Sequence, residues 1–237
     1  MNDCASDAPV KKPRIKWYVI ASMVMVATLF MQSSSTIDES VPREMTANMI
    51  LSAIMNVHGT WLLVVLLCLT FVGHDSSTRT SELKMDEFHD ADVVKGMVLG
   101  VVCFFTFLGI VFLTQTSMEY FKVMIMDETI WHTVISNSTI GGKISIAVGV
   151  IIIIPIVEEI VFRHTMYHAV ASILPYWFAT VSSAALFAVA HGDLIALPAY
   201  FALALLLQEA YRRTDRLYVP ITMHATFNVF ILTFSQL

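Results

Sequence analysis

Charged residues are scarce in this sequence, and their scarcity excludes an ordinary soluble protein. Asp, Glu, Lys and Arg make up only 14% of the 237 residues, whereas soluble domains carry about 25%. Hydrophobic residues make up 57%. A water-soluble domain of this size could not bury so much apolar side chain, so we expect a lipid bilayer to cover much of the surface.

The sequence also lacks the patterns of a nucleic-acid-binding protein and of a metalloprotein. The net charge is −5 and the basic residues do not form a stripe, so no nucleic-acid partner is predicted. The three cysteines, Cys4, Cys68 and Cys103, match neither a disulfide framework nor a zinc motif. We therefore interpret the cysteines as small apolar core residues.

Long apolar runs, by contrast, occur along the whole chain. A helix needs about 20 mostly apolar residues to cross a bilayer, and the candidate runs are 17–33, 48–72, 96–114, 143–163, 176–191, 194–211 and 219–236. The predicted fold is all-α, a polytopic transmembrane helical bundle of about seven spans (six to eight). Pro155, Pro175 and Pro198 interrupt or bound three of the runs, which membrane helices tolerate where neighbours satisfy the freed backbone groups.

Lys and Arg residues indicate the orientation of these spans, because they are enriched in cytoplasmic segments. With a cytoplasmic N-terminus, three basic residues fall outside (Arg43, Lys122 and Lys143), and Arg163 is left out because it lies in a motif. The ten that fall inside are Lys11, Lys12, Arg14, Lys16, Arg79, Lys84, Lys95, Arg212, Arg213 and Arg216. The first run is either a cleavable signal peptide or an uncleaved signal anchor, and the spans that follow favour the anchor.

These observations divide the chain into three parts. Residues 1–16 form a cytoplasmic tail, residues 17–142 hold the N-terminal spans with a cytoplasmic loop at 73–95, and residues 143–237 form a C-terminal helical core. The apolar, mid-sized, single-chain architecture favours a multi-pass protein of the bacterial cytoplasmic membrane over one of the endoplasmic reticulum.

Three charged side chains, Glu158, Glu159 and Arg163, lie in or at the end of the apolar run 143–163. A charge at the centre of a bilayer costs roughly 2.5–3.5 kcal/mol, so such residues are either paired or functional. Glu159 and Arg163 are four residues apart with the acid first, the favourable order for a helical ion pair. Glu158 is turned by about 100° from Glu159 and is expected to project elsewhere, free for other work. The alternative is an ion pair that only anchors the helix.

Two later runs carry polar residues at helical spacing. Phe187 and His191 share one face of their helix, and His224 and Asn228 share one face of theirs. Taken singly, each is explained by packing or by an interhelical hydrogen bond. Together with a free carboxylate they supply a base, groups that orient water, and donors for an oxyanion. Water-mediated hydrolysis of an amide requires this set.

The motifs resemble the signature of a known family. Residues 158–163 read EExxxR, residues 187–191 read FxxxH and residues 224–228 read HxxxN. In this order, each on an apolar helix, they are similar to the CAAX protease and bacteriocin-processing family, also called the Abi family, over residues 143–237. One departure is His164, where many members have glycine. The resemblance implies a membrane-embedded, glutamate-dependent endopeptidase whose substrate is a peptide or protein associated with the membrane.

The resemblance also implies four catalytic residues and three that support them. The catalytic set is Glu158, His191, His224 and Asn228, and the supporting set is Glu159, Arg163 and Phe187. In this scheme the glutamate activates water as the general base, and the first histidine holds and polarises that water. The second histidine and the asparagine stabilise the oxyanion, and no metal takes part.

Two other interpretations stay open. Glu158 with His191 and His224, or His164 with His168, could bind zinc, although the sequence has no HExxH motif. A scaffold or a bacteriocin-immunity protein that acts by binding could also use this fold. A transporter is disfavoured, because the first three spans hold few polar residues.

The depths of Glu158 and His191 set a geometric condition. In straight helices that span 30 Å, the two residues would differ in depth by roughly 10–15 Å. Either the helix of Glu158 continues well past Arg163, to about Ile173, or the boundaries of the spans differ from those given above.

Overall fold

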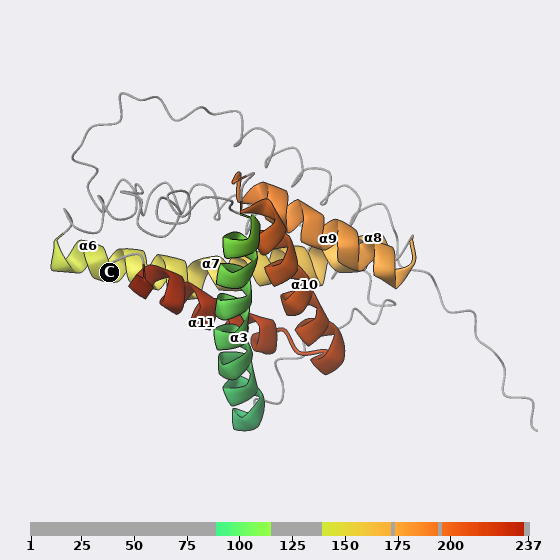
Figure 1. Ribbon diagram of the computed structural model, residues 1–237. Coiled ribbons are helices and arrows are strands. Elements are labelled where there is room, and N and C mark those ends of the chain that lie inside the picture. The colour runs from blue at the N-terminus through green and yellow to red at the C-terminus, as the bar shows by residue number, and fades with distance from the viewer. Residues whose placement is uncertain (1–88, 115–138, 172–173, 194–195, 235–237) are drawn as a thin grey trace, which may run out of the picture.

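The computed structural model describes residues 89–114, 139–171, 174–193 and 196–234 (Figure 1). Every regular element in these ranges is a helix and none is a strand, which confirms the all-α prediction for this part of the chain. The elements are α3 (Asp90–Thr114), α6 (Ile140–Val148), η1 (Gly149–Ile153), α7 (Ile154–Glu159), η2 (Ile160–Met166), α8 (Tyr167–Ala171), α9 (Tyr176–Ala190), α10 (Leu197–Thr214) and α11 (Tyr218–Phe234). The tail 1–16, the predicted spans 17–33 and 48–72, and most of the loop 73–95 lie outside the described residues.

Two of the described helices are long and apolar enough to cross a membrane. They are Asp90–Thr114, with 25 residues, and Ile140–Ala171, with 32 residues, whereas α9 and α11 are shorter apolar helices. Large apolar side chains are exposed on their outer faces, for example Val98, Phe105 and Leu113 on α3. Extended apolar faces of this kind are typical of surfaces that contact a membrane or another protein.

The segments α6, η1, α7, η2 and α8 form one continuous helix that ends at Ala171 (Figure 1). The helix of Glu158 therefore continues well past Arg163, which is the first of the two possibilities stated above. The predicted span 143–163 was too short at both ends. The helix begins at Ile140, where the Thr139 side chain caps it. It continues past Phe162 because the polar and charged side chains that follow turn into the interior instead of ending it.

Two stretches of this long helix are π-helical, with hydrogen bonds between residues five positions apart. In η1 the Ile154 N–H bonds the Gly149 carbonyl, and in η2 the Tyr167 N–H bonds the Phe162 carbonyl. Such turns are rare and frequently lie at functional sites. Here η1 and η2 flank the short α-helical segment α7, which ends with the two glutamates.

Helices α3 and α11 pack closely and run in the same direction. Gly96 lies against Val219 and Thr222, and one turn later Gly100 lies against the backbone of Met223. A Cβ atom added at Gly100 would lie 2.5 Å from the Met223 carbonyl oxygen, so only glycine allows this approach. Met223 directly precedes His224 on α11, so this contact determines where His224 lies.

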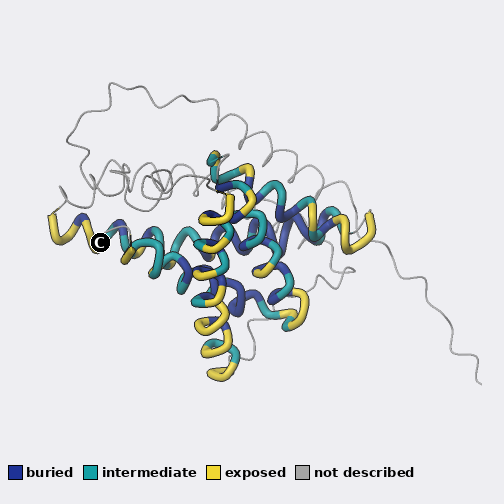
Figure 2. Tube along the Cα trace, viewed as in Figure 1, coloured by how far each residue is buried: buried dark blue, intermediate teal, exposed yellow. Residues whose placement is uncertain are grey.

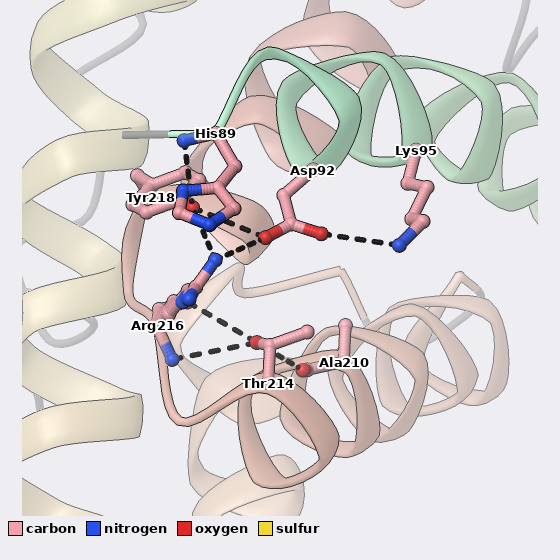
Figure 3. A network of polar contacts seen from close by, with 7 residues as sticks. All are labelled: His89, Asp92, Lys95, Ala210, Thr214, Arg216 and Tyr218. Atoms are coloured by element: carbon pink, nitrogen blue, oxygen red, sulfur yellow. Dashed lines mark hydrogen bonds and ion pairs between the residues drawn. The ribbon is translucent and has the colours of Figure 1, made fainter. Parts of the chain in front are cut away.

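A polar network joins the beginning of α3 to the turn between α10 and α11 (Figure 3). Arg216 pairs with Asp92, and the Tyr218 hydroxyl donates to the same carboxylate at 3.2 Å. Asp92 also pairs with Lys95 at 3.2 Å. Hydrogen bonds to Tyr218 and Asp92 raise the pKa of Arg216 above its usual value, so this cation stays charged. The network fixes three helix ends on one side of the molecule.

The best-buried part of the described chain lies where α7 and η2 meet α9, α10 and α11 (Figure 2). The far end of α6 and the outer faces of α3 and α9 are exposed in the same view. The buried region contains most of the polar residues that the sequence singled out.

Candidate active site

Glu159 and Arg163 form the ion pair that their spacing predicts. Arg163 Nε lies 3.0 Å from Glu159 Oε2, and neither side chain is more than 1% exposed. Arg163 Nη2 also donates to the Ala204 carbonyl oxygen on α10 at 3.4 Å, and its guanidinium lies 4.5 Å from the centroid of the Phe187 ring. The cation is thus held by a carboxylate, a backbone oxygen and an aromatic face, which together offset part of its desolvation.

His224, on α11, lies between the two glutamates. Its Nδ1 is 2.9 Å from Glu159 Oε1, and its Nε2 is 3.8 Å from Glu158 Oε2. All three side chains are buried. Glu158 projects in a different direction from Glu159, but both reach the same imidazole because the two ring nitrogens lie on different edges of the ring.

The hydrogen bond to Glu159 sets the orientation of the ring. A carboxylate accepts, so Nδ1 carries the hydrogen and Nε2 is turned toward Glu158. The 3.8 Å between Nε2 and Glu158 Oε2 is too long for a direct hydrogen bond. Among the described residues, Glu158 Oε2 has no hydrogen-bond partner. This carboxylate oxygen is therefore buried, beside an imidazole and unsatisfied.

His191 is the residue at which α9 ends, and its ring is held on two sides. Nδ1 donates to the Phe187 carbonyl oxygen at 2.8 Å, and the ring stacks on Tyr200 of α10 with centroids 4.1 Å apart. Gly192, which follows, has φ +71, a conformation that suits glycine at a helix end. His191 also interacts electrostatically with Glu158 and His224. Its Nε2 is the nitrogen that the bond to Phe187 leaves available.

Asn228 lies one turn after His224 on α11, and its carboxamide binds the backbone. Its Nδ2 donates to the Val150 carbonyl oxygen in η1 at 2.8 Å. In the π-helical register the partner of that carbonyl is the N–H of residue 155, which is proline and has none. Asn228 therefore satisfies a carbonyl that the helix itself cannot, a role that sequence spacing did not reveal.

The structure thus brings six of the seven predicted site residues into one contact network, whereas Asn228 lies one turn along α11 and bonds the backbone of η1. Phe187 completes the network, since its ring lies 5.8 Å from that of His224 and 4.5 Å from that of His191. Sequence reasoning missed Tyr200 and Ala204, which lie on an apolar helix without any motif. No spacing rule marks a stacking ring or a backbone acceptor.

His164 and His168, one of the two residue sets proposed to bind zinc, lie in η2 and α8, after Arg163 on the long helix. His164 is buried, with its ring 5.6 Å from that of His168, and His168 Nε2 is 3.1 Å from the Tyr211 hydroxyl. Within the described ranges, no three His, Cys, Asp or Glu side chains are placed to hold a metal ion.

Comparison with known families bears on the same segment of the chain. Residues 140–230 match the model of the family described as type II CAAX prenyl endopeptidase Rce1-like. This C-terminal region is therefore similar to that family. The match covers all three motifs and confirms the resemblance to CAAX proteases inferred from them.

Two curated bacterial relatives align with part of the chain. The putative membrane peptidase YdiL of Bacillus subtilis is 36% identical over 78 residues, which are 33% of this chain and 32% of the relative. The membrane-embedded CAAX protease MroQ of Staphylococcus aureus is 36% identical over 105 residues, which are 41% of this chain and 42% of the relative. The chain thus spans less than half the length of each relative, and no solved structure matches it.

Proposed function

We propose that this protein is a multi-pass intramembrane endopeptidase in which Glu158 activates water to hydrolyse a peptide bond. The observation that carries the proposal is the His224 imidazole between two buried carboxylates, inside an Rce1-like region. Buried, unsatisfied ionisable groups in an apolar bundle are costly and are found where chemistry needs them. The substrate is a membrane-associated peptide or protein, and the reaction uses no metal or cofactor.

The 3.8 Å between Glu158 Oε2 and His224 Nε2 is a spacing that one water molecule can bridge. If a water oxygen lies about 2.8 Å from both Glu158 Oε2 and His224 Nε2, the two hydrogen bonds meet at that oxygen at an angle of about 85°. Such a water would donate to the carboxylate, which accepts its proton as the water attacks the scissile carbonyl carbon. Glu158 then returns that proton to the leaving nitrogen as the C–N bond breaks. His191 Nε2 is a second group that can hold this water, because Nδ1 is already used.

Stabilisation of the oxyanion falls to His224 and Asn228. Because Nδ1–H is donated to Glu159, His224 donates from Nε2 only as an imidazolium, with both ring nitrogens protonated. Asn228 Nδ2 has two hydrogens and gives one to Val150, which leaves the other for the substrate oxygen. Glu159 and Arg163 are positioning residues: Glu159 orients the His224 ring, Arg163 holds Glu159, and neither contacts the substrate in this scheme.

The proposed location is the bacterial cytoplasmic membrane, with the N-terminus in the cytoplasm. Among the described residues, three helical segments (Ile140–Ala171, α9 and α10) lie between α3 and α11, and these two helices run in the same direction. The basic residues Arg212, Arg213 and Arg216 lie at the end of the bundle where α3 begins. Cytoplasmic ends of membrane helices are enriched in such residues.

Comparative peptidomics of membranes tests the proposal. Cells carrying wild type, Glu158→Gln or Glu209→Gln are compared, since Glu209 is a partly exposed glutamate on α10 paired with Arg212 and Arg213. We expect the same cleavage products from wild type and Glu209→Gln, and their loss with Glu158→Gln. Products that persist with Glu158→Gln at equal protein level would contradict a glutamate mechanism and favour a binding protein. Products that vanish only after chelation would favour zinc.

A further inference from the structure

Gln208, on α10, is a buried carboxamide that the site described above does not use. It is 1% exposed. Neither Nε2 nor Oε1 has a hydrogen-bond partner among the described residues. Buried side-chain polar atoms almost always have a partner, and an exception in a native structure is commonly a place where water binds.

Helix geometry places the carboxamide of Gln208 near the point where Arg163 reaches α10. Arg163 Nη2 bonds the carbonyl oxygen of Ala204, one helical turn before Gln208. Helix carbonyls point toward the C-terminal end, and therefore toward the turn of Gln208. Helix side chains lean the opposite way, over the residue four positions earlier. Both groups therefore approach the same spot above the small side chain of Ala204.

Arg163 also has an unsatisfied atom. Its Nε is used by Glu159, its Nη2 by Ala204, and one face by Phe187. Its Nη1 has no hydrogen-bond partner among the residues that the structure describes. An unpaired donor and an unpaired acceptor on neighbouring groups can both be satisfied by one small molecule that bonds the two.

We propose that bound water links the carboxamide of Gln208 to Nη1 of Arg163. Water alone among small ligands donates to Oε1 and accepts from Nε2 and Nη1 without adding charge to a buried site. The chain of contacts continues through Glu159 and His224 to Glu158, whose Oε2 is also unsatisfied. The site holds water beside the carboxylates of an apolar bundle. Its use as a supply for hydrolysis rests on the proposed function, whereas the binding of water does not.

Water-edited solid-state NMR of the full-length protein in liposomes tests this proposal. The chain has four glutamines, Gln32, Gln115, Gln208 and Gln236, so side-chain ¹⁵N labelling of glutamine gives few signals. The Gln208 signal is the one lost in Gln208→Met. We expect it to receive magnetisation from water much faster than the backbone amide of Leu207, its buried neighbour. Transfer as slow as at Leu207 would show a dry site and overturn the proposal.

Thermal stability provides an independent test with a matched control. Methionine has the unbranched shape of glutamine but no polar atoms, and Leu207→Met controls for placing it in buried α10. If water bridges Gln208 to Arg163, then Gln208→Met lowers the Tm relative to Leu207→Met, because Arg163 loses its bridged partner. If the site is dry, the change removes two unsatisfied atoms and raises the Tm, which would refute the proposal.

The two proposals fail separately. The water signal of Gln208 is expected to persist in Glu158→Gln, whether or not the wild-type protein cleaves peptides. A dry Gln208 in a protein that Glu158→Gln inactivates would overturn the water site alone. A hydrated Gln208 in a protein without peptidase activity would uphold the water site and remove the proposed function.

Discussion

Single side chains determine the chemistry of the buried site, and Glu159 joins two of them. One of its oxygens accepts from His224 Nδ1 and the other pairs with Arg163 Nε. Because Glu159 is fully buried, bulk water cannot take its place as the hydrogen-bond or ion-pair partner of His224 and Arg163. This residue therefore links the stability of the helix bundle to the orientation of the imidazole that faces Glu158.

Glu159→Gln tests this link. We expect a loss of about 3–5 kcal/mol in stability, because the variant leaves the charge of Arg163 buried without a counterion. Peptidase activity should also fall, since His224 loses a charged acceptor. The double variant Glu159→Gln/Arg163→Met should recover most of the stability and none of the activity. Unfolding in detergent and peptide cleavage measure the two effects, and a single variant as stable as wild type would exclude the link.

Residue spacing predicted one half of these contacts and missed the other. Glu159 and Arg163 lie four residues apart on one helix, so their ion pair follows from helix geometry alone, and the structure confirms it. His224 lies 65 residues after Glu159. Their contact depends on how α11 packs, and no spacing within one helix contains that information.

At the scale of helices, backbone irregularities place the site. The π-helical turn η1 and Pro155 together leave the Val150 carbonyl without an intrahelical partner, and Asn228 supplies one from α11. This hydrogen bond holds α11 against the long helix, one turn from His224. Proline was visible in the sequence, but the register that makes it matter was not, because a π-helical turn has no distinct side-chain period.

Asn228→Ala is expected to cost about 1–3 kcal/mol in stability, the penalty of a buried carbonyl without a partner. In a Pro155→Ala background the loss should be smaller, because the backbone N–H restored at position 155 can bond that carbonyl. A double-mutant cycle on thermal unfolding measures the difference. Equal losses in both backgrounds would show that Asn228 and Pro155 act independently.

The glycines of α3 offer a second test of helix placement. Gly100→Ala would put a methyl group 2.5 Å from the Met223 carbonyl oxygen, whereas nothing lies within 4 Å of a Cβ at Gly109 on the same helix. We expect Gly100→Ala to lose roughly 1–3 kcal/mol of stability by overpacking and to lower kcat by shifting His224.

Gly109→Ala serves as the control for that change. It should be neutral or stabilise α3 by up to about 1 kcal/mol, because alanine is the better helix former. The Tm and kcat of Gly100→Ala and Gly109→Ala are compared. Equal values for the two variants would rule out that close packing at Gly100 positions α11.

At the scale of the whole molecule, composition predicted the helical fold, and the motifs predicted the family resemblance. The apolar runs predicted an all-helical chain, and the described part is one. The number of spans and the side of the N-terminus remain predictions, because the first two runs lie outside the described residues. Packing partners were out of reach, since exposed and buried faces of membrane helices are both apolar.

Cysteine labelling tests the orientation of the bundle. After replacement of Cys4, Cys68 and Cys103, single cysteines are introduced as Arg213→Cys, at a side chain 72% exposed, and Gly141→Cys, where a new Cβ meets open space. A membrane-impermeant maleimide is expected to reach the first only from the cytoplasmic side and the second only from the outer side. Labelling of both from one side would refute the proposed topology.

The most direct test of a glutamate-activated water is the kcat/KM of purified Glu158→Gln with a cleavable peptide in detergent, beside Glu209→Gln. Removing a general base typically costs about 100- to 10,000-fold in rate. We predict a loss in that range for Glu158→Gln, an unchanged Tm, and wild-type activity for Glu209→Gln. Wild-type kcat/KM in a folded Glu158→Gln protein would contradict the mechanism.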